Sequence, residues 1–143
     1  MNRALLKAQL VKHEGLRRFP YMDTVGKLTI GVGRNLTDRG ITEVEAAFLL
    51  DDDVTRVEGE LRAALHWYDR LDDIRQTVLA NMAFNLGTFG LLQFTNTLSL
   101  IEHGDYDLAA KHMLKSKWAS QVKGRAVELA ELMRTAPTKE IHP

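Results

Sequence analysis

The spacing of apolar residues changes twice along this chain of 143 residues, and that change limits the possible folds most. Residues 3–13 carry leucines at helical spacing, whereas residues 27–32 alternate apolar and other side chains, which is typical of a strand. From residue 42 onward the helical spacing returns. The pattern predicts a small sheet followed by a helical lobe, an α+β arrangement.

Between the two helical regions we expect a β-hairpin. Its arms would lie at residues 19–22 and 27–32, joined by the turn "DTVG", in which Gly26 supplies the positive φ that such turns often need. The "TEVE" string that follows fits a capping box. In that motif Thr42 accepts from the backbone N–H of Glu45, and the Glu45 side chain reaches back.

Further helices are expected in the C-terminal part, each with a start or stop signal. They are 72 or 73 to 86 with Gly87 as the stop, 95–103 closed by Gly104, 105–116, and 125–134. We expect one domain over residues 1–143. Its parts would be a hairpin lobe at about 13–40, a helical lobe made of 1–12 and 41–136, and a frayed tail at 137–143.

Composition excludes several classes of protein. There are no cysteines, so disulfide scaffolds, thiolate metal sites and cysteine nucleophiles are out of the question. The five histidines lack zinc-binding spacing, and we expect neither a metal nor a cofactor. No apolar run approaches the roughly 20 residues of a transmembrane helix. Lysines 7 and 12 interrupt any signal-peptide core. The expected location is therefore the cytoplasm of the cell that makes the protein.

Charge is balanced overall but unevenly spread. The net charge is +5 over residues 1–40, −6 over 41–80 and +1 over 81–143. The basic start and the lysine-rich stretch 111–125 would suit an anionic polymer such as nucleic acid or peptidoglycan. A solvated surface explains both clusters equally well, so charge alone assigns no partner.

Two acids flank the change from helix to strand. Glu14 ends the first helix, and Asp23 precedes the hairpin turn with Thr29 on the far arm. A carboxylic acid facing a water held by a carboxylate and a hydroxyl is the arrangement for inverting glycoside hydrolysis. Each residue also has a structural explanation: a solvated charge for Glu14, turn hydrogen bonds for Asp23 and strand propensity for Thr29.

The combined string carries more information than these residues separately. "E-G-x-R-x-x-x-Y-x-D-x-x-G-x-x-T-I-G-x-G", which begins at Glu14, strongly resembles the phage-type lysozymes, the muramidase endolysins of glycoside hydrolase family 24. The matching positions are Glu14, Gly15, Arg17, Tyr21, Asp23, Gly26, Thr29, Ile30, Gly31 and Gly33. "NMAFNLG" (81–87), "FTNTL" (94–98) and "KSKW" (115–118) also resemble segments of that family.

The resemblance implies a lysozyme-like fold with a cleft between two lobes. It implies that Glu14 is the general acid and that Asp23 and Thr29 position the attacking water. The substrate would be the β-1,4 bond from N-acetylmuramic acid to N-acetylglucosamine in peptidoglycan. Arg125 would reach back to Glu14, and Gly31 would support the site. A basic residue on a solvated helix face is the alternative for Arg125.

The resemblance places other residues in the cleft as sugar contacts. Asn35, Thr97 and His112 match such positions, although His112 also fits a plain surface residue. Phe84 matches too, but an aromatic residue at helical spacing is usually part of the core. Asn85 would bond a sugar amide or simply end its helix.

Two departures from the family pattern stand out. Relatives often have His after "TIGxG", where this chain has Arg34. If that His normally pairs with an acid, the matching acid here is Asp53, so we expect an Arg34–Asp53 ion pair. The segment between "RNLT" and "GITEVE" is also nearly absent, which predicts a smaller sheet region and a more open cleft edge.

The preferred hypothesis is a monomeric endolysin that lyses a phage host from within. Without a signal sequence it would depend on a holin-type membrane lesion. The alternatives are a non-catalytic peptidoglycan-binding module, a lytic transglycosylase, a nucleic-acid binder and a membrane-disrupting protein. The acidic middle and the lack of a helix-turn-helix signature argue against nucleic acid, and no stable membrane insertion is expected.

Overall fold

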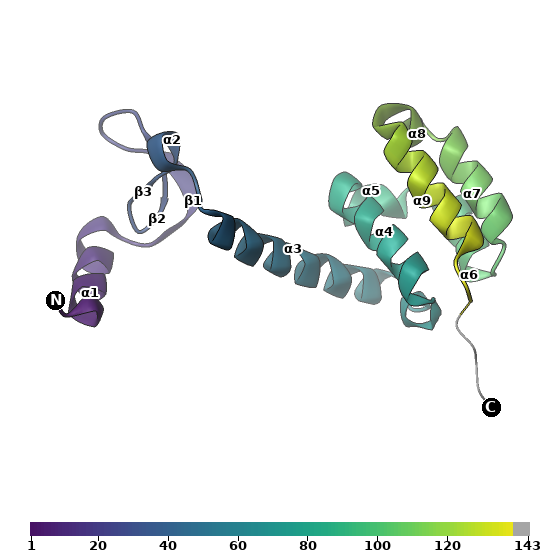
Figure 1. Cartoon of the computed structure of the whole chain (residues 1–143), viewed down its shortest axis with the longest axis horizontal. Coiled ribbons are helices and arrows are strands. Elements are labelled where there is room, and N and C mark those ends of the chain that lie inside the picture. Colours follow the sequence, from purple (N-terminus) through teal and green to yellow (C-terminus); the bar gives the residue numbers. More distant parts are fainter. Residues whose placement is uncertain (139–143) are drawn as a thin grey trace. The chain divides into compact units, whose positions relative to one another are not determined.

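The computed structural model describes residues 1–138 and divides into two compact units (Figure 1). The first unit is Met1–Leu49, and the second begins at Leu50. The boundary falls inside one helix, α3, which spans Glu43–Ala64.

The first unit begins with helix α1, Arg3–Glu14. Asn2 caps its start, where its Oδ1 accepts from the Leu5 N–H at 2.9 Å, and this satisfies one of the donors that a helix start leaves unpaired. Gly15 ends the helix at φ +79°, a conformation that glycine adopts without steric cost. The expected helix at residues 3–13 is thus confirmed, and Glu14 is its last residue.

A three-stranded antiparallel sheet follows in the order β1-β2-β3. Its strands are β1 Arg17–Met22, β2 Leu28–Gly31 and β3 Arg34–Asn35. Tyr21 pairs with Thr29, and Thr29 pairs on its other side with Asn35. The expected hairpin is confirmed, including the positive φ of Gly26 at +80°. The third strand was not predicted, because two residues are too few to show an alternating pattern.

Helices α2, Leu36–Arg39, and α3, Glu43–Ala64, complete the first unit and lead out of it. The capping box at the start of α3 is present as expected. The Thr42 Oγ1 accepts from the Glu45 N–H at 3.1 Å, and the Glu45 Oε1 accepts from the Thr42 N–H at 2.8 Å. Helix α2 was not predicted, since it is a single turn.

The second unit is helical throughout its described part. Its elements after α3 are η1 Tyr68–Arg70, α4 Asp73–Leu86, α5 Thr88–Leu92, α6 Thr95–Glu102, α7 Tyr106–Lys115, α8 Lys117–Val122 and α9 Gly124–Thr135. The four longer helices match their expected ranges within one residue at each end. The one-turn or two-turn elements η1, α5 and α8 were missed, because they are too short for a periodic pattern.

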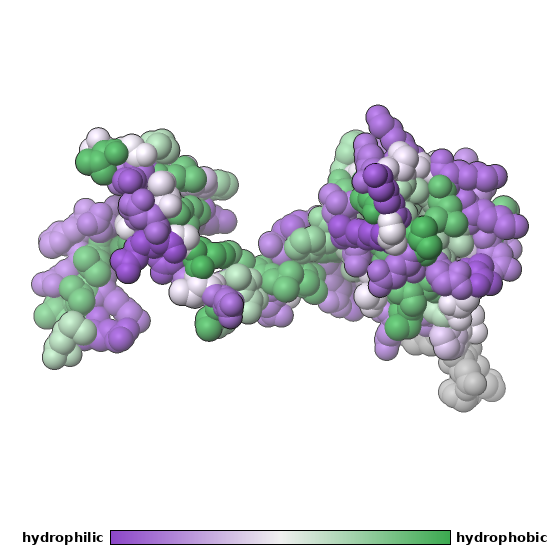
Figure 2. Space-filling model, turned by 45° about the horizontal axis from the view of Figure 1, so that its top comes forward, coloured by the Kyte–Doolittle hydropathy of each residue, from purple (hydrophilic) through white to green (hydrophobic). Residues whose placement is uncertain are grey.

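The second unit holds one continuous hydrophobic core. Its members include Leu61, Leu79, Met113 and Met133, each fully buried. Apolar side chains such as Phe48 and Leu50 also remain exposed on α3. Figure 2 shows hydrophobic surface (green) along this helix. Within residues 1–138 no helix is both long enough and apolar enough to cross a membrane. The expected tail at 137–143 lies mostly outside the described residues.

These elements make an α+β, lysozyme-like fold, as expected from the sequence. The division into a hairpin lobe and a helical lobe that includes residues 1–12 stays a prediction.

Candidate functional site

Glu14 lies at the C-terminal end of α1, where Gly15 turns the chain toward β1. Its side chain lies against Gly33, in the turn between β2 and β3. A Cβ atom added at Gly33 would be 3.2 Å from the Glu14 Oε2 and 3.3 Å from its Cδ and Cγ. Gly33 is part of the motif in the sequence, but no role was predicted for it.

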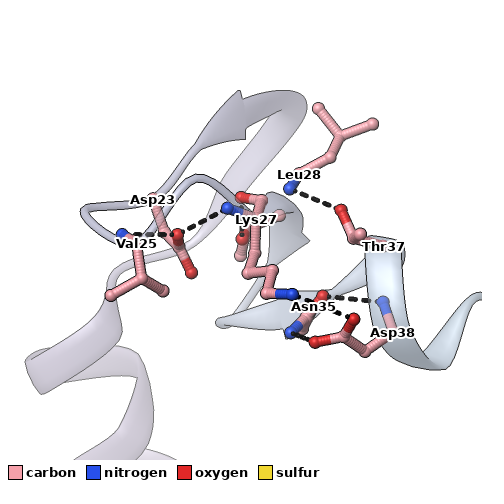
Figure 3. Close-up of polar contacts among 8 residues, drawn as sticks. Asp23, Val25, Lys27, Leu28, Asn35, Thr37 and Asp38 are labelled. Carbon is pink, nitrogen blue, oxygen red and sulfur yellow. Dashed lines mark hydrogen bonds and ion pairs between the residues drawn. The ribbon is translucent and has the colours of Figure 1, made fainter.

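Asp23 shapes the hairpin turn (Figure 3). Its Oδ1 accepts from the N–H of Val25 at 3.0 Å and from the N–H of Lys27 at 2.8 Å. Turn hydrogen bonds, the structural explanation considered for this residue, are therefore present. Among residues 1–138 no hydrogen bond is made to the second oxygen, Oδ2, which leaves that oxygen for another donor.

Thr29 is 4% exposed, in the middle of the sheet. Its hydroxyl donates to the Lys27 carbonyl at 3.0 Å. A hydroxyl has one donor and two acceptor positions, so Thr29 keeps the ability to accept a hydrogen bond. Asp23 and Thr29 thus both bond to the main chain of Lys27, one through its N–H and one through its C=O. The sequence did not indicate this role of Lys27, because the bonds to Asp23 and Thr29 are made by main-chain atoms, which every residue type except proline has.

Asn35 caps helix α2 (Figure 3). Its Oδ1 accepts from the Asp38 N–H at 3.0 Å, and its Nδ2 donates to the Asp38 Oδ2 at 2.9 Å. The Nζ of Lys27 lies 3.2 Å from the other Asp38 oxygen. The hydrogen bond from Asn35 is the largest cause, and that from Lys27 the second, that lowers the pKa of Asp38 below its usual range. Both polar atoms of Asn35 are engaged here, and the sugar contact expected for it stays a prediction.

Arg34 has a partner in its own unit that was not expected. Its Nη1 lies 2.7 Å from the Glu45 Oε1 and donates to the Gly40 carbonyl at 3.2 Å. Asp53, the expected partner, belongs to the second unit, where it lies 4.0 Å from Arg56, and the Arg34–Asp53 pair stays a prediction. The short connection after β3 and the capping box bring Glu45 within reach of Arg34.

The ion pair with Arg34 affects the ionisation of Glu45. The hydrogen bond from Arg34, followed by the one from the Thr42 N–H, lowers the pKa of Glu45 to about 2. Glu45 is therefore ionised throughout the neutral and mildly acidic range. Gly31, expected to support the site, has φ +69° and open space where a side chain would be.

The other expected site residues belong to the second unit. Arg125 donates to the Asn81 Oδ1 from Nε at 2.9 Å and from Nη2 at 2.6 Å. Both residues line a cavity of about 500 Å³, together with Phe84, which is 47% exposed. Phe84 is thus not a core residue of its own unit. Asn81 was missed as the residue that holds Arg125.

The three remaining residues differ in exposure. The Oδ1 of Asn85 accepts from the indole N–H of the buried Trp118 at 2.9 Å, so this amide fixes a core side chain. Thr97 is 5% exposed on α6, which leaves little of its surface for a ligand. His112 is half-buried on α7. Sugar contacts at these positions, and an Arg125–Glu14 pair, stay predictions.

Within residues 1–138 no cluster of three or more His, Asp or Glu side chains is arranged to hold a metal ion. The chemistry of the candidate site is that of carboxyl groups, a hydroxyl and the main chain.

The sequence model described as "Phage lysozyme" matches residues 11–135. The chain belongs to the phage lysozyme family. The match includes every residue expected to be in the site, from Glu14 to Arg125, and it confirms the resemblance found from the motif.

Several known proteins are 27–29% identical to this chain. The chain is 29% identical to "Probable T4-type lysozyme 1" of Dictyostelium discoideum, over 91% of this chain and 94% of that protein. It is 28% identical to the "SAR-endolysin" of Escherichia phage Mu, over 88% of this chain and 77% of the relative. It is 29% identical to the "Pre-baseplate central spike protein" of Enterobacteria phage T4, but covers only 27% of that protein's length. Members of the family thus occur both as lysozyme-sized proteins and within longer ones.

Proposed function

We propose that this member of the phage lysozyme family is a muramidase. It would hydrolyse the β-1,4 bond between N-acetylmuramic acid and N-acetylglucosamine in bacterial peptidoglycan. The observation that carries the proposal is the shared attachment of Asp23 and Thr29 to the main chain of Lys27. The family match and the intact Glu14 support it further.

The hydrogen bonding around Lys27 suits the binding of a nucleophilic water. The Thr29 hydroxyl already donates to Lys27, so toward a water molecule it acts as an acceptor. The free Oδ2 of Asp23 is an acceptor as well. A water that donates one hydrogen to each has its lone pair free to attack the anomeric carbon.

The proposed reaction then follows the inverting route. Glu14, protonated, donates its proton to the glycosidic oxygen as the bond to the anomeric carbon breaks. The water adds to the opposite face of that carbon and gives up a proton to Asp23. The products are a sugar with a free 4-hydroxyl and a reducing N-acetylmuramic acid of inverted configuration.

The decisive test is clearing of outer-membrane-permeabilised Gram-negative cells by the wild type and by Glu14→Gln. General acid catalysis contributes about 10²- to 10⁴-fold, so Glu14→Gln should clear at least about 100-fold more slowly. Glu43→Gln, at an exposed acid in the first turn of α3, is the matched control and should behave as the wild type. Equal clearing by wild type and Glu14→Gln would disprove the assignment of Glu14.

Product analysis separates hydrolysis from the main alternative. A reducing N-acetylmuramic acid end means hydrolysis, whereas a 1,6-anhydro end means lytic transglycosylation. A protein that binds isolated peptidoglycan in a pull-down but releases no new ends would instead be a binding module.

We also propose that the activity serves host lysis, as the name of the relative in phage Mu suggests for that protein. A monomer released through holin-type membrane lesions would reach the wall from inside. Cells that express the chain should then lyse on addition of chloroform and remain intact without it. Lysis without chloroform would show that no separate membrane lesion is needed.

A further inference from the structure

The turn between β2 and β3 is flanked and formed by two glycines with nearly the same φ. Gly31 has φ +69° and Gly33 has φ +67°. Their surroundings differ, because a Cβ at Gly31 would meet nothing within 4 Å, whereas one at Gly33 would meet Glu14. We propose that Gly33 is a positioning residue, whose missing side chain provides the space in which the Glu14 carboxyl group is held. This inference rests on the proposed function.

The contact involves most of the Glu14 side chain. The added Cβ would be 3.2 Å from Oε2, 3.3 Å from Cδ and 3.3 Å from Cγ. Carbon atoms in favourable contact are about 3.5–4.0 Å apart. Any residue other than glycine at position 33 therefore requires either the turn or the Glu14 side chain to move by a few tenths of an ångström.

The turn is held by contacts that do not involve Glu14. Ile30 and Arg34 are ladder partners and close the turn around residues 31–33. Arg34 is anchored in addition to Glu45 at 2.7 Å and to the Gly40 carbonyl at 3.2 Å. Glu14, by contrast, is an exposed side chain at a helix end, and within residues 1–49 its carboxyl group receives no hydrogen bond. Within this unit the Glu14 carboxyl group is therefore the part that moves.

A displaced Glu14 carboxyl group changes proton transfer more than substrate binding. A general acid must lie within hydrogen-bond reach of the leaving oxygen, and a misplacement of about 1 Å can cost about 100-fold in rate. A shift of a few tenths of an ångström should thus lower kcat by about tenfold. KM, which reflects the many contacts along the glycan, should change little.

The test compares Gly33→Ala with Gly31→Ala. Both substitutions place alanine at φ near +68°, so both should lower Tm by a similar amount. On soluble, uncrosslinked glycan strands, Gly33→Ala should have a kcat about tenfold below that of Gly31→Ala, with KM values within about threefold of each other. Equal kcat values for the two variants would overturn the proposal.

A second comparison asks whether the effect passes through Glu14. In the Glu14→Gln background the carboxylic acid is already absent, so adding Gly33→Ala should leave the residual rate unchanged. The same tenfold loss in that background would show that Gly33 acts by another route. An inactive wild type would disprove the proposed function itself, which is a different outcome from either result for Gly33.

If the alanine variants fold poorly, Asn replaces Ala at both positions. Asn tolerates the left-handed conformation and still carries a Cβ. Gly33→Asn should again fall about tenfold below Gly31→Asn in kcat, and equal values would overturn the proposal as before.

Discussion

Arg75 is the largest of the fully buried side chains in the described structure, and it joins three helices of the second unit. Its Nη1 lies 2.9 Å from the Asp72 Oδ1 at the start of α4, and its Nε donates to the Met133 carbonyl at 2.7 Å. The guanidinium also stacks on the ring of Tyr106, 3.5 Å from the centroid. Arg75 thus binds a carbonyl in the last turn of α9, which the helix leaves unpaired.

Replacing Arg75 with Met should lower the free energy of unfolding by about 3–5 kcal/mol, because Asp72 would remain buried without its partner. Urea denaturation measures this loss. Arg70→Met, at an exposed arginine in η1, is the control and should change stability by less than about 0.5 kcal/mol. Equal losses in the two variants would show that the buried pair contributes nothing beyond its surroundings.

Single residues also show how far sequence reasoning reaches. Glu14, Asp23 and Thr29 could be predicted as site residues because they belong to a sequence motif with fixed spacing. The roles of Lys27 and Gly33 could not be predicted, since one contributes main-chain atoms and the other a missing Cβ. The partner that Arg34 has in its own unit, Glu45, was not predicted, because the acid was chosen by analogy with relatives and the connection after β3 is shorter here.

At the scale of elements, the ion pair between Arg34 and Glu45 ties β3 to the first turn of α3. The folded-state pKa of Glu45 is about 2, below its unfolded value, so its contribution to stability is full above about pH 4.5 and disappears as the pH falls toward 2. Glu45→Gln should therefore lower Tm at pH 7, and the difference from wild type should shrink steadily between pH 4.5 and 2.

Asp53→Asn is the matched control for this pH series. Asp53 is a half-buried acid on the same helix, 4.0 Å from Arg56, and such solvent-accessible pairs contribute little. Its Tm difference from wild type should stay small over the whole pH range. A Glu45→Gln difference that does not depend on pH would contradict the ion pair as its cause.

Helices differed in how well the sequence predicted them, and the reason is length. Helix α4 has both a start and a stop signal, since Asp72 caps it and Gly87 ends it at φ +77°. Its range was therefore predicted closely. Elements η1, α5 and α8 span three to six residues and form where the neighbouring helices pack, which no local pattern records.

At the scale of the whole molecule, the hydrophobic core belongs to the second unit and runs from Val57 to Met133. A fragment that starts at Leu50 should therefore unfold cooperatively by itself, because it contains every residue of that core. Thermal unfolding followed by circular dichroism tests this. A broad, non-cooperative transition would contradict it.

Leu79→Ala in the same fragment shows whether the core is the source of the cooperativity. Leu79 is fully buried, and its truncation should lower the free energy of unfolding by about 2–5 kcal/mol. Leu114→Ala, at a leucine of α7 that is 47% exposed, should cost much less.

The main chain of Lys27 has a consequence for how the family can change over time. Its N–H and C=O are present in every residue type except proline, which lacks the N–H. Position 27 can therefore change to other amino acids while the main-chain partners of Asp23 and Thr29 are kept, with loss of the exposed Lys27–Asp38 ion pair. A scan of side-chain replacements would remove only that ion pair, whereas Lys27→Pro would also remove the N–H that donates to Asp23.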